Sequence, residues 1–143
     1  MDKILERPDL SMLVDCIKKS NISHILESQD QLITVFAPTN NGMSKTLGFH
    51  EGVMDGTLNQ TYVASILKRH KITGHGKVRT EDIRGFDGPE ISLDDGTGTI
   101  HFHKYNNGSI VAIEKGHMNR TVNLIETDID ASNGILHIID GLL

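Results

Sequence analysis

One stretch, from Leu32 to Asn40, limits what this chain can fold into more than any other. It begins with Leu-Ile-Thr-Val-Phe, an apolar run of strand length whose residue types favour a buried β-strand. Pro38 then ends the run, because it has no N–H to donate to a neighbouring strand, and Thr39 or Asn40 can cap a helix that follows. The stretch therefore predicts a strand that turns into a helix close to the hydrophobic core.

Two helices are predicted before this corner. Apolar residues recur at i, i+3, i+4 and i+7 from Leu10 to Ile17, which predicts an amphipathic helix that opens at Pro8-Asp9. A shorter repeat of the same pattern predicts a second helix over 22–26. The single cysteine, Cys16, lies on or beside the apolar face of the first helix, so we interpret it as part of the core.

Two more helices are predicted after the corner. The first runs from Asn40 toward Phe49, and we expect it to fray because Gly42 lowers helix propensity by about 1 kcal/mol relative to alanine. The second follows Thr57-Leu-Asn-Gln60, which has the form of a capping box, and its apolar stripe ends at His70.

From Ile91 onward the apolar pattern changes to a period of two, which is typical of strands. The expected strands cover residues 91–93, 99–105, 109–113, 120–125 and 135–139. Asn106-Asn-Gly108 is a hairpin turn signal between two of them. Helices in the first half of the chain and strands in the second predict the α+β class.

Two sequence boxes resemble those of the fasciclin (FAS1) domain family. They are Thr34-Val-Phe-Ala-Pro-Thr-Asn40 and Asn133-Gly-Ile-Leu-His-Ile-Ile-Asp140, in the order of the family and with the second near the C-terminus. The resemblance implies one FAS1-like domain over residues 1–143, a β-sandwich or wedge flanked by several α-helices. This sequence departs from the family pattern at Asn41-Gly42-Met43, where alanine and phenylalanine are usual. We expect structural roles for Thr34, Phe36, Pro38, Thr39, Asn40, Asn133, Gly134, His137 and Asp140.

The resemblance also implies a non-catalytic adhesion or binding module. Such domains usually belong to exported chains, so we expect a secreted, cell-surface or periplasmic location, with the native signal sequence missing from this piece. The implied partners are extracellular or cell-surface proteins or glycans, and neighbouring domains of a longer protein. The expected position of the second box is beside the Val35-Phe36 strand, with Asn133-Gly134 as the turn that aims it.

Three residues are predicted to contact a partner through this resemblance. His70 matches the histidine of the tyrosine-histidine motif of the family, although Arg69 replaces the tyrosine. Asp128 and Ile129 lie where animal adhesion members carry short integrin-recognition motifs centred on Asp-Ile. Each has a structural alternative: His70 as a buried ring bonded to backbone carbonyls, Asp128 as a turn cap and Ile129 as core.

Other chemistry receives weaker support from the sequence. His101 and His103 project from one face of a predicted strand and could bind a metal if Tyr105 or a carboxylate on a neighbouring strand supplied a third ligand. A solvent-facing surface is the simpler explanation, because two histidines alone bind a metal weakly. Asp94-Asp-Gly-Thr-Gly98 and Asp128-Ile-Asp130 resemble fragments of calcium loops without the ligand spacing of an EF-hand. We expect no cofactor and no bound metal. Standard catalytic motifs are absent from the sequence, which leaves a small-ligand-binding protein or a carbohydrate-ester hydrolase as the alternative function.

Charge and length exclude several classes of protein. A net charge of −5 without a lysine or arginine cluster argues against binding to nucleic acid or to an anionic membrane. No apolar run approaches the roughly 18 residues that a membrane-spanning helix needs. Four Asn-x-Ser/Thr sequons are potential glycan sites in a eukaryotic secreted protein: Asn21, Asn59, Asn107 and Asn119.

Overall fold

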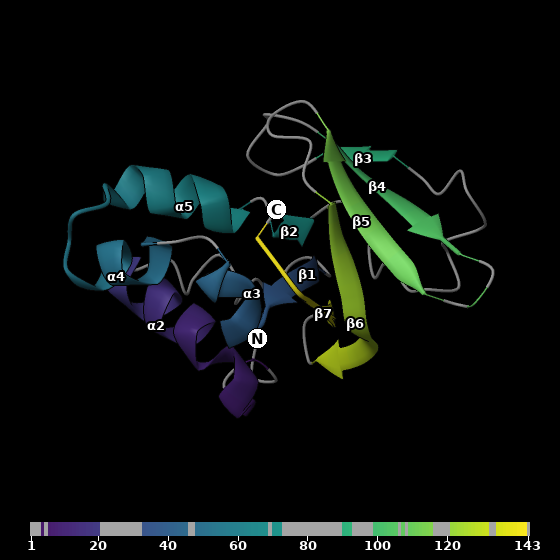
Figure 1. The fold of residues 1–143 in the computed structure, drawn as a ribbon, viewed down its shortest axis with the longest axis horizontal. Helices are drawn as coiled ribbons and strands as arrows, with labels where there is room; N and C mark the ends of the chain where they lie inside the picture. Colours follow the sequence, from purple (N-terminus) through teal and green to yellow (C-terminus); the bar gives the residue numbers. More distant parts are fainter. Residues whose placement is uncertain are drawn as a thin grey trace.

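A computed structural model shows helices from the first half of the chain packed beside a curled β-sheet (Figure 1). It describes residues 4, 6–20, 33–45, 48–68, 70–72, 90–92, 99–105, 107, 109–115, 121–131 and 134–142. Several predictions lie outside the described residues. These are the helix over 22–26, the loop 94–98, Arg69, Asn133, and the sequons at Asn21 and Asn119.

The helices follow the predicted apolar patterns, with corrections at their ends. Their bounds are η1 Pro8–Leu10, α2 Ser11–Ser20, α3 Asn40–Ser44, α4 Phe49–Met54 and α5 Gln60–Lys68. Helix α5 is capped by Asn59 and not by Thr57 of the capping-box pattern, because the Oδ1 atom of Asn59 accepts the N–H of Thr61 at 2.7 Å. The frayed helix after the corner is in fact two short helices, and Gly48, at φ 79°, stands just before the second.

Gly42 has a tertiary reason to be small that helix propensity does not reveal. A Cβ atom built on it would lie 2.6 Å from the carbonyl carbon of Asp140 and 2.8 Å from the amide nitrogen of Gly141. Helix α3 therefore approaches the end of the second box at a distance that only glycine permits. Met43 beside it is fully buried.

The described strands form one seven-stranded sheet in the order β2-β1-β7-β6-β5-β4-β3. Their bounds are β1 Ile33–Pro38, β2 Lys71–Ile72, β3 Glu90–Ser92, β4 Thr99–Lys104, β5 Ile110–Lys115, β6 Thr121–Ala131 and β7 Gly134–Ile139. Strands β1 and β7 pair in parallel, and all other pairs are antiparallel. The second box therefore lies beside the Val35-Phe36 strand, as predicted. Strand β6 runs six residues past the predicted end at Ile125, so Glu126–Asp130 is strand where a turn was considered.

The sheet folds back on itself, which gives the domain its wedge. Strands β7, β6 and β5 separate β1 from β4, so a flat sheet would hold these two roughly 19 Å apart at about 4.8 Å per strand. Instead the ring of Phe36 on β1 lies 5.6 Å from the ring of Phe102 on β4. A buried cluster fills the inside of this curl: Phe36, Ile100, Phe102, Ile110, Ala112, Val122, Leu124 and Ile139.

A second core lies between the helices and the opposite face of β1 and β7. It joins Val35, Ala37, Leu136 and Ile138 to apolar residues of α2, α4 and α5. Because both faces of β1 and β7 are covered, every residue of the two strands is buried, which explains their continuous apolar sequences. Figure 1 shows the helices and strands β3–β5 on opposite sides of these two central strands.

Candidate functional site

The most irregular backbone in the sheet is the segment of β6 that contains Asp128. The pairing of β6 with β7 shifts register between Leu124 and Glu126 and again between Glu126 and Ile129. Asp128 has φ +57°, and it alone among the described non-glycine residues has a positive φ. Aspartate tolerates this left-handed conformation better than most residues, at a cost of roughly 1–2 kcal/mol. Such bulges bend a strand and re-aim its side chains.

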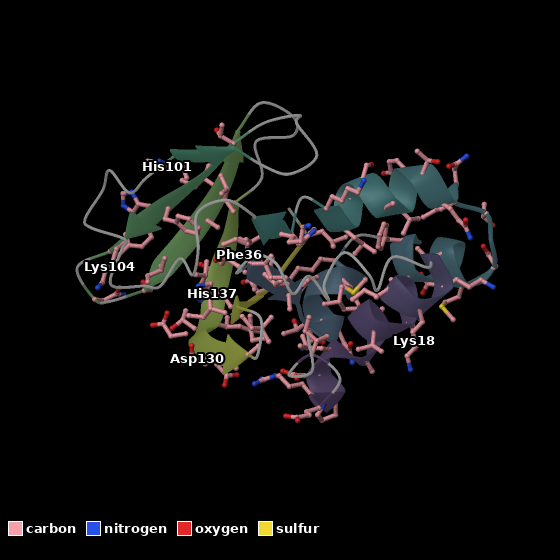
Figure 2. The ribbon with its side chains drawn as sticks, turned by 180° about the vertical axis from the view of Figure 1, so that it is seen from behind. Lys18, Phe36, His101, Lys104, Asp130 and His137 are labelled. Carbon is pink, nitrogen blue, oxygen red and sulfur yellow. The ribbon has the colours of Figure 1, made fainter. Side chains whose placement is uncertain are left out.

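A buried histidine of the second box holds this bulge. The Nδ1 atom of His137 accepts the backbone N–H of Asp128 at 3.2 Å. Its ring is 1% exposed and stacks on Phe36, with ring centres 5.6 Å apart (Figure 2). A backbone N–H can only donate, so Nδ1 carries no proton in this contact and the neutral ring is protonated at Nε2.

The side chains around the bulge divide between solvent and core. Asp128 and Ile129 are half-buried, whereas Glu126 and Asp130 are exposed. Ile129 packs against the helix-side core and pairs with Leu136, which favours the structural interpretation of this residue. Asp128 has the same intermediate burial as Ile129, but it carries the charged group of the two predicted contact residues.

An ion-pair network ties the N-terminal segment to the same strand. Arg7 donates from Nη2 to Glu126 at 2.6 Å and to Asp9 at 3.0 Å. These hydrogen bonds, first that with Asp9 and then that with Glu126, raise the pKa of the Arg7 guanidinium, and the bond to Arg7 lowers the pKa of Asp9. The negative charge of Glu126 is thus balanced within the domain. This contact joins positions 119 residues apart, and the sequence carried no signal for it.

His70, the third predicted contact residue, is 3% exposed. Its Nδ1 lies 2.8 Å from the carbonyl oxygen of Ile66, and because a carbonyl only accepts, this nitrogen carries the proton. Its own carbonyl accepts the N–H of Phe36 at 2.7 Å. These contacts favour the structural interpretation of His70, and a partner at the surface has no direct access to the ring.

The first box makes the corner through two different side chains. Thr39 caps α3, since its Oγ1 accepts the N–H of Gly42 at 3.1 Å. Asn40 instead joins α3 to the start of α2: its Oδ1 accepts the N–H of Met12 at 2.9 Å, and its Nδ2 donates to Ser11 Oγ at 2.9 Å. Of the two residues proposed to cap the helix that follows, Thr39 does so and Asn40 serves an earlier helix.

The last residue of the second box, Asp140, bonds to the neighbouring strand β6. The carboxylate of Asp140 accepts the backbone N–H and the side-chain Nδ2 of Asn123, each at 2.8 Å, and Lys45 Nζ lies 3.8 Å away. Burial acts to raise the pKa of Asp140, but these hydrogen bonds and the Lys45 charge together lower it below its ordinary value. At the other end of β7, a Cβ on Gly134 would collide with the carbonyl oxygen of Ile33. The other boxed residues, Thr34, Phe36 and Pro38, are buried on β1.

The predicted metal ligands share one face of β4. His101 and His103 are half-buried, alternate with buried Ile100 and Phe102, and the ring of His103 lies 4.6 Å from that of Tyr105. Within the described part of the chain, no group of three or more His, Cys, Asp or Glu residues could hold a metal ion. Cys16 is buried, as predicted, and burial followed by the charge of Asp15 raises the pKa of its thiol to about 12. The Cys16 thiol is therefore unreactive at neutral pH.

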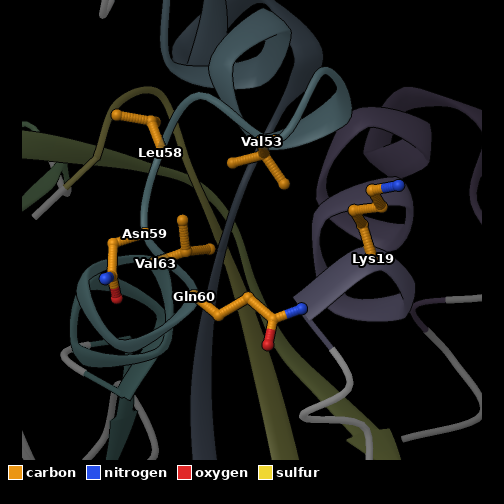
Figure 3. A pocket seen from close by; sticks show the side chains of 7 residues that line it. Lys19, Val53, Leu58, Asn59, Gln60 and Val63 are labelled. Carbon is orange, nitrogen blue, oxygen red and sulfur yellow. The ribbon is translucent and has the colours of Figure 1, made fainter.

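A pocket of about 220 Å³ opens between the end of α2, helix α4 and the start of α5 (Figure 3). It is lined by Lys19, Val53, Gly56, Leu58, Asn59, Gln60 and Val63. None of these seven is a serine, a histidine or an acid, so this pocket has no nucleophile with an adjacent base.

No described helix is both long enough and apolar enough to cross a membrane.

Comparisons with known proteins agree with this architecture. The family model described as the fasciclin domain matches residues 8–143. Curated protein sequences give no match. The structure of a FAS1 domain pair from the insect cell adhesion molecule fasciclin I superposes with a TM-score of 0.78 at 21% identity, covering 99% of this chain and 49% of that chain. The chain thus spans about half the length of that structure, and the likeness concerns the fold.

Proposed function

Because the chain belongs to the fasciclin domain family, we propose that it is a non-catalytic binding module for a protein or glycan partner outside the cell or at its surface. The observation that carries the proposal is the left-handed bulge at Asp128. Irregular backbone of this kind costs free energy and clusters at ligand-binding positions. The family resemblance supports the proposal as well, since it aligns this segment with the short recognition motifs, centred on Asp-Ile, of animal adhesion members.

The proposed contact is made by the Asp128 carboxylate and the accessible part of Ile129. A half-buried carboxylate can accept charge-assisted hydrogen bonds from a partner or complete the coordination of a metal ion that the partner holds. The contact does not extend to the whole acidic segment, since Glu126 is already paired with Arg7. His70 is not included, because its ring is buried.

The test is adhesion of cells, or binding of matrix proteins and glycans, to the immobilised domain. Asp128→Asn is the informative variant, because asparagine also tolerates a left-handed backbone and differs mainly in charge. Loss of one charge-assisted contact should weaken binding about tenfold or more. Glu51→Gln, which makes the same chemical change at an exposed site on α4, should bind like the parent domain. Unchanged binding by Asp128→Asn would refute the proposed contact.

The alternative, a small-ligand protein or ester hydrolase, requires a site that the pocket beside α5 does not supply. That pocket is lined mainly by aliphatic and amide side chains together with Lys19. Release of a chromophore from acetyl and feruloyl esters by the purified domain, abolished by substitution of one serine or histidine, would favour the hydrolase over the binding module.

A further inference from the structure

We infer that His137 is the positioning residue of the Asp128 segment: its unprotonated Nδ1 accepts the backbone N–H of Asp128 in the bulge, and so fixes how Asp128 and Ile129 are presented. This inference rests on the proposed function of that segment. His137 belongs to the second box, whose residues were expected only to shape the core. The inference gives it a second role, at the surface proposed to contact a partner.

The register of the two strands explains why such an acceptor is needed. Glu126 of β6 pairs with Ile138, and the next pair is Ile129 with Leu136. Thr127 and Asp128 therefore lie opposite a single residue of β7, His137. Such a bulge disrupts the ladder locally and leaves one extra residue out of the regular pairing. The amide of Asp128 is satisfied by the His137 ring, a side-chain acceptor in place of a backbone carbonyl.

The ring is held too firmly to adapt to a different backbone. It is 1% exposed and stacks on Phe36, which is itself fully buried between the two halves of the curled sheet. Figure 2 shows the Phe36 and His137 side chains together at the centre of the domain. The position of Nδ1 is therefore set by the core, and the amide of Asp128 must come to it.

The orientation of both contact residues follows from this bulge. Side chains alternate between the two faces of a strand, so removal of one bulge residue would move the neighbours to opposite faces. In the observed register Ile129 faces the helix-side core beside Leu136, and Asp128 stays half-exposed. If the Asp128 amide lost its acceptor, the left-handed conformation would lose the contact that offsets its cost. The segment would then sample other registers, in which the carboxylate and the isoleucine are no longer presented together.

Two substitutions separate the acceptor from the shape of the ring. His137→Phe keeps a flat ring for stacking on Phe36 but removes the acceptor. His137→Asn loses the ring but can place Oδ1 close to the former position of Nδ1. Because either change affects packing, stability alone does not distinguish positioning from a structural role. The exchange rate of the Asp128 amide with deuterium, measured by NMR on the folded chain, does distinguish them.

In His137→Phe we expect the Asp128 amide to exchange about tenfold faster or more, while the amides of β1 exchange as in the parent domain. His137→Asn should restore most of this protection, and binding to cells or matrix should fall and recover in parallel. Unchanged protection of Asp128 in His137→Phe would overturn the inference, whatever the binding shows. A third outcome is that His137→Phe loses protection of the Asp128 amide while both His137→Phe and Asp128→Asn bind like the parent domain. That outcome would refute the proposed function and leave the positioning of the bulge established.

A measurement on the unsubstituted protein covers the case in which His137→Phe does not fold. Two-bond correlations between ring protons and nitrogens identify which nitrogen of His137 carries the proton. We expect the Nε2–H form, with Nδ1 coupled to the Asp128 amide across the hydrogen bond. An Nδ1–H form would leave the Asp128 amide without this acceptor and would overturn the inference.

Discussion

Substitution of Asn40 by alanine should test whether the first box is a structural corner. Its Oδ1 accepts the N–H of Met12, one of the first amides of α2, which have no partner within their own helix. Its Nδ2 donates to Ser11 Oγ at 2.9 Å and, more weakly, to the carbonyl of Pro8 at 3.4 Å. The side chain therefore joins two helices that begin 29 residues apart in the sequence.

The expected cost can be worked out from these contacts. Loss of the bond to Met12 resembles the loss of a helix cap, about 1 kcal/mol. The Ser11 hydroxyl is exposed and can bond to water instead, so the second contact adds at most about 1 kcal/mol. Asn40→Ala should therefore lower the free energy of unfolding by about 1–2 kcal/mol.

The measurement is urea denaturation followed by circular dichroism. Asn41→Ala is the matched control, because Asn41 is the next residue of α3 and is exposed to solvent. That control should stay within about 0.5 kcal/mol of the parent domain. If Asn40→Ala were no less stable than Asn41→Ala, the bonds between α3 and α2 would contribute nothing and the argument for a structural corner would fail.

Two further predictions concern the contacts of the second box. Gly42→Ala should destabilise the domain by about 1–3 kcal/mol, although alanine favours helix, because its Cβ would meet the backbone of Asp140; a gain in stability by denaturation would contradict this close approach. The lowered pKa of Asp140 means that its contribution to stability is present above the unfolded pKa of about 3.9 and is lost as the pH falls through the folded value. Asp140→Asn should flatten the pH dependence of unfolding below about pH 4, and an unaltered acid limb would exclude this carboxylate as a source of it.

The sequence was sufficient where a pattern is local and repeated. The apolar run of β1, the helical spacing from Leu10 to Ile17 and the alternation of β4 each predicted the element found there. The position of β7 beside β1 followed from a second argument, that two strands without a polar face must both be interior, whereas their parallel direction was not predicted. Burial of His70 followed from its place on an apolar stripe.

The sequence was insufficient where a contact depends on geometry between distant segments. Gly42 was interpreted as a weak helix former, but its size is required by a backbone that arrives from the other end of the chain. The cap of α5 fell to Asn59 because a capping-box pattern does not decide which of several polar residues adopts the extended backbone of a cap. The pairing of Arg7 with Glu126 depends on where β6 passes, which no local pattern encodes.

The bulge at Asp128 shows why box residues and contact residues cannot be assigned to separate roles. An Asp-Ile pair tolerates many conformations, so its own sequence does not predict a positive φ. The conformation is determined by a mismatch of two residues against one, and that mismatch is stabilised by a ring from the second box. A substitution of His137 therefore acts on the core through its stacking on Phe36, and on the surface through the amide of Asp128.

His137→Ala would remove both contacts at once. Loss of binding in that variant would therefore not show which of the two contacts the partner requires. Only variants that keep one of the two contacts, a ring without an acceptor or an acceptor without a ring, can assign the binding effect to the bulge.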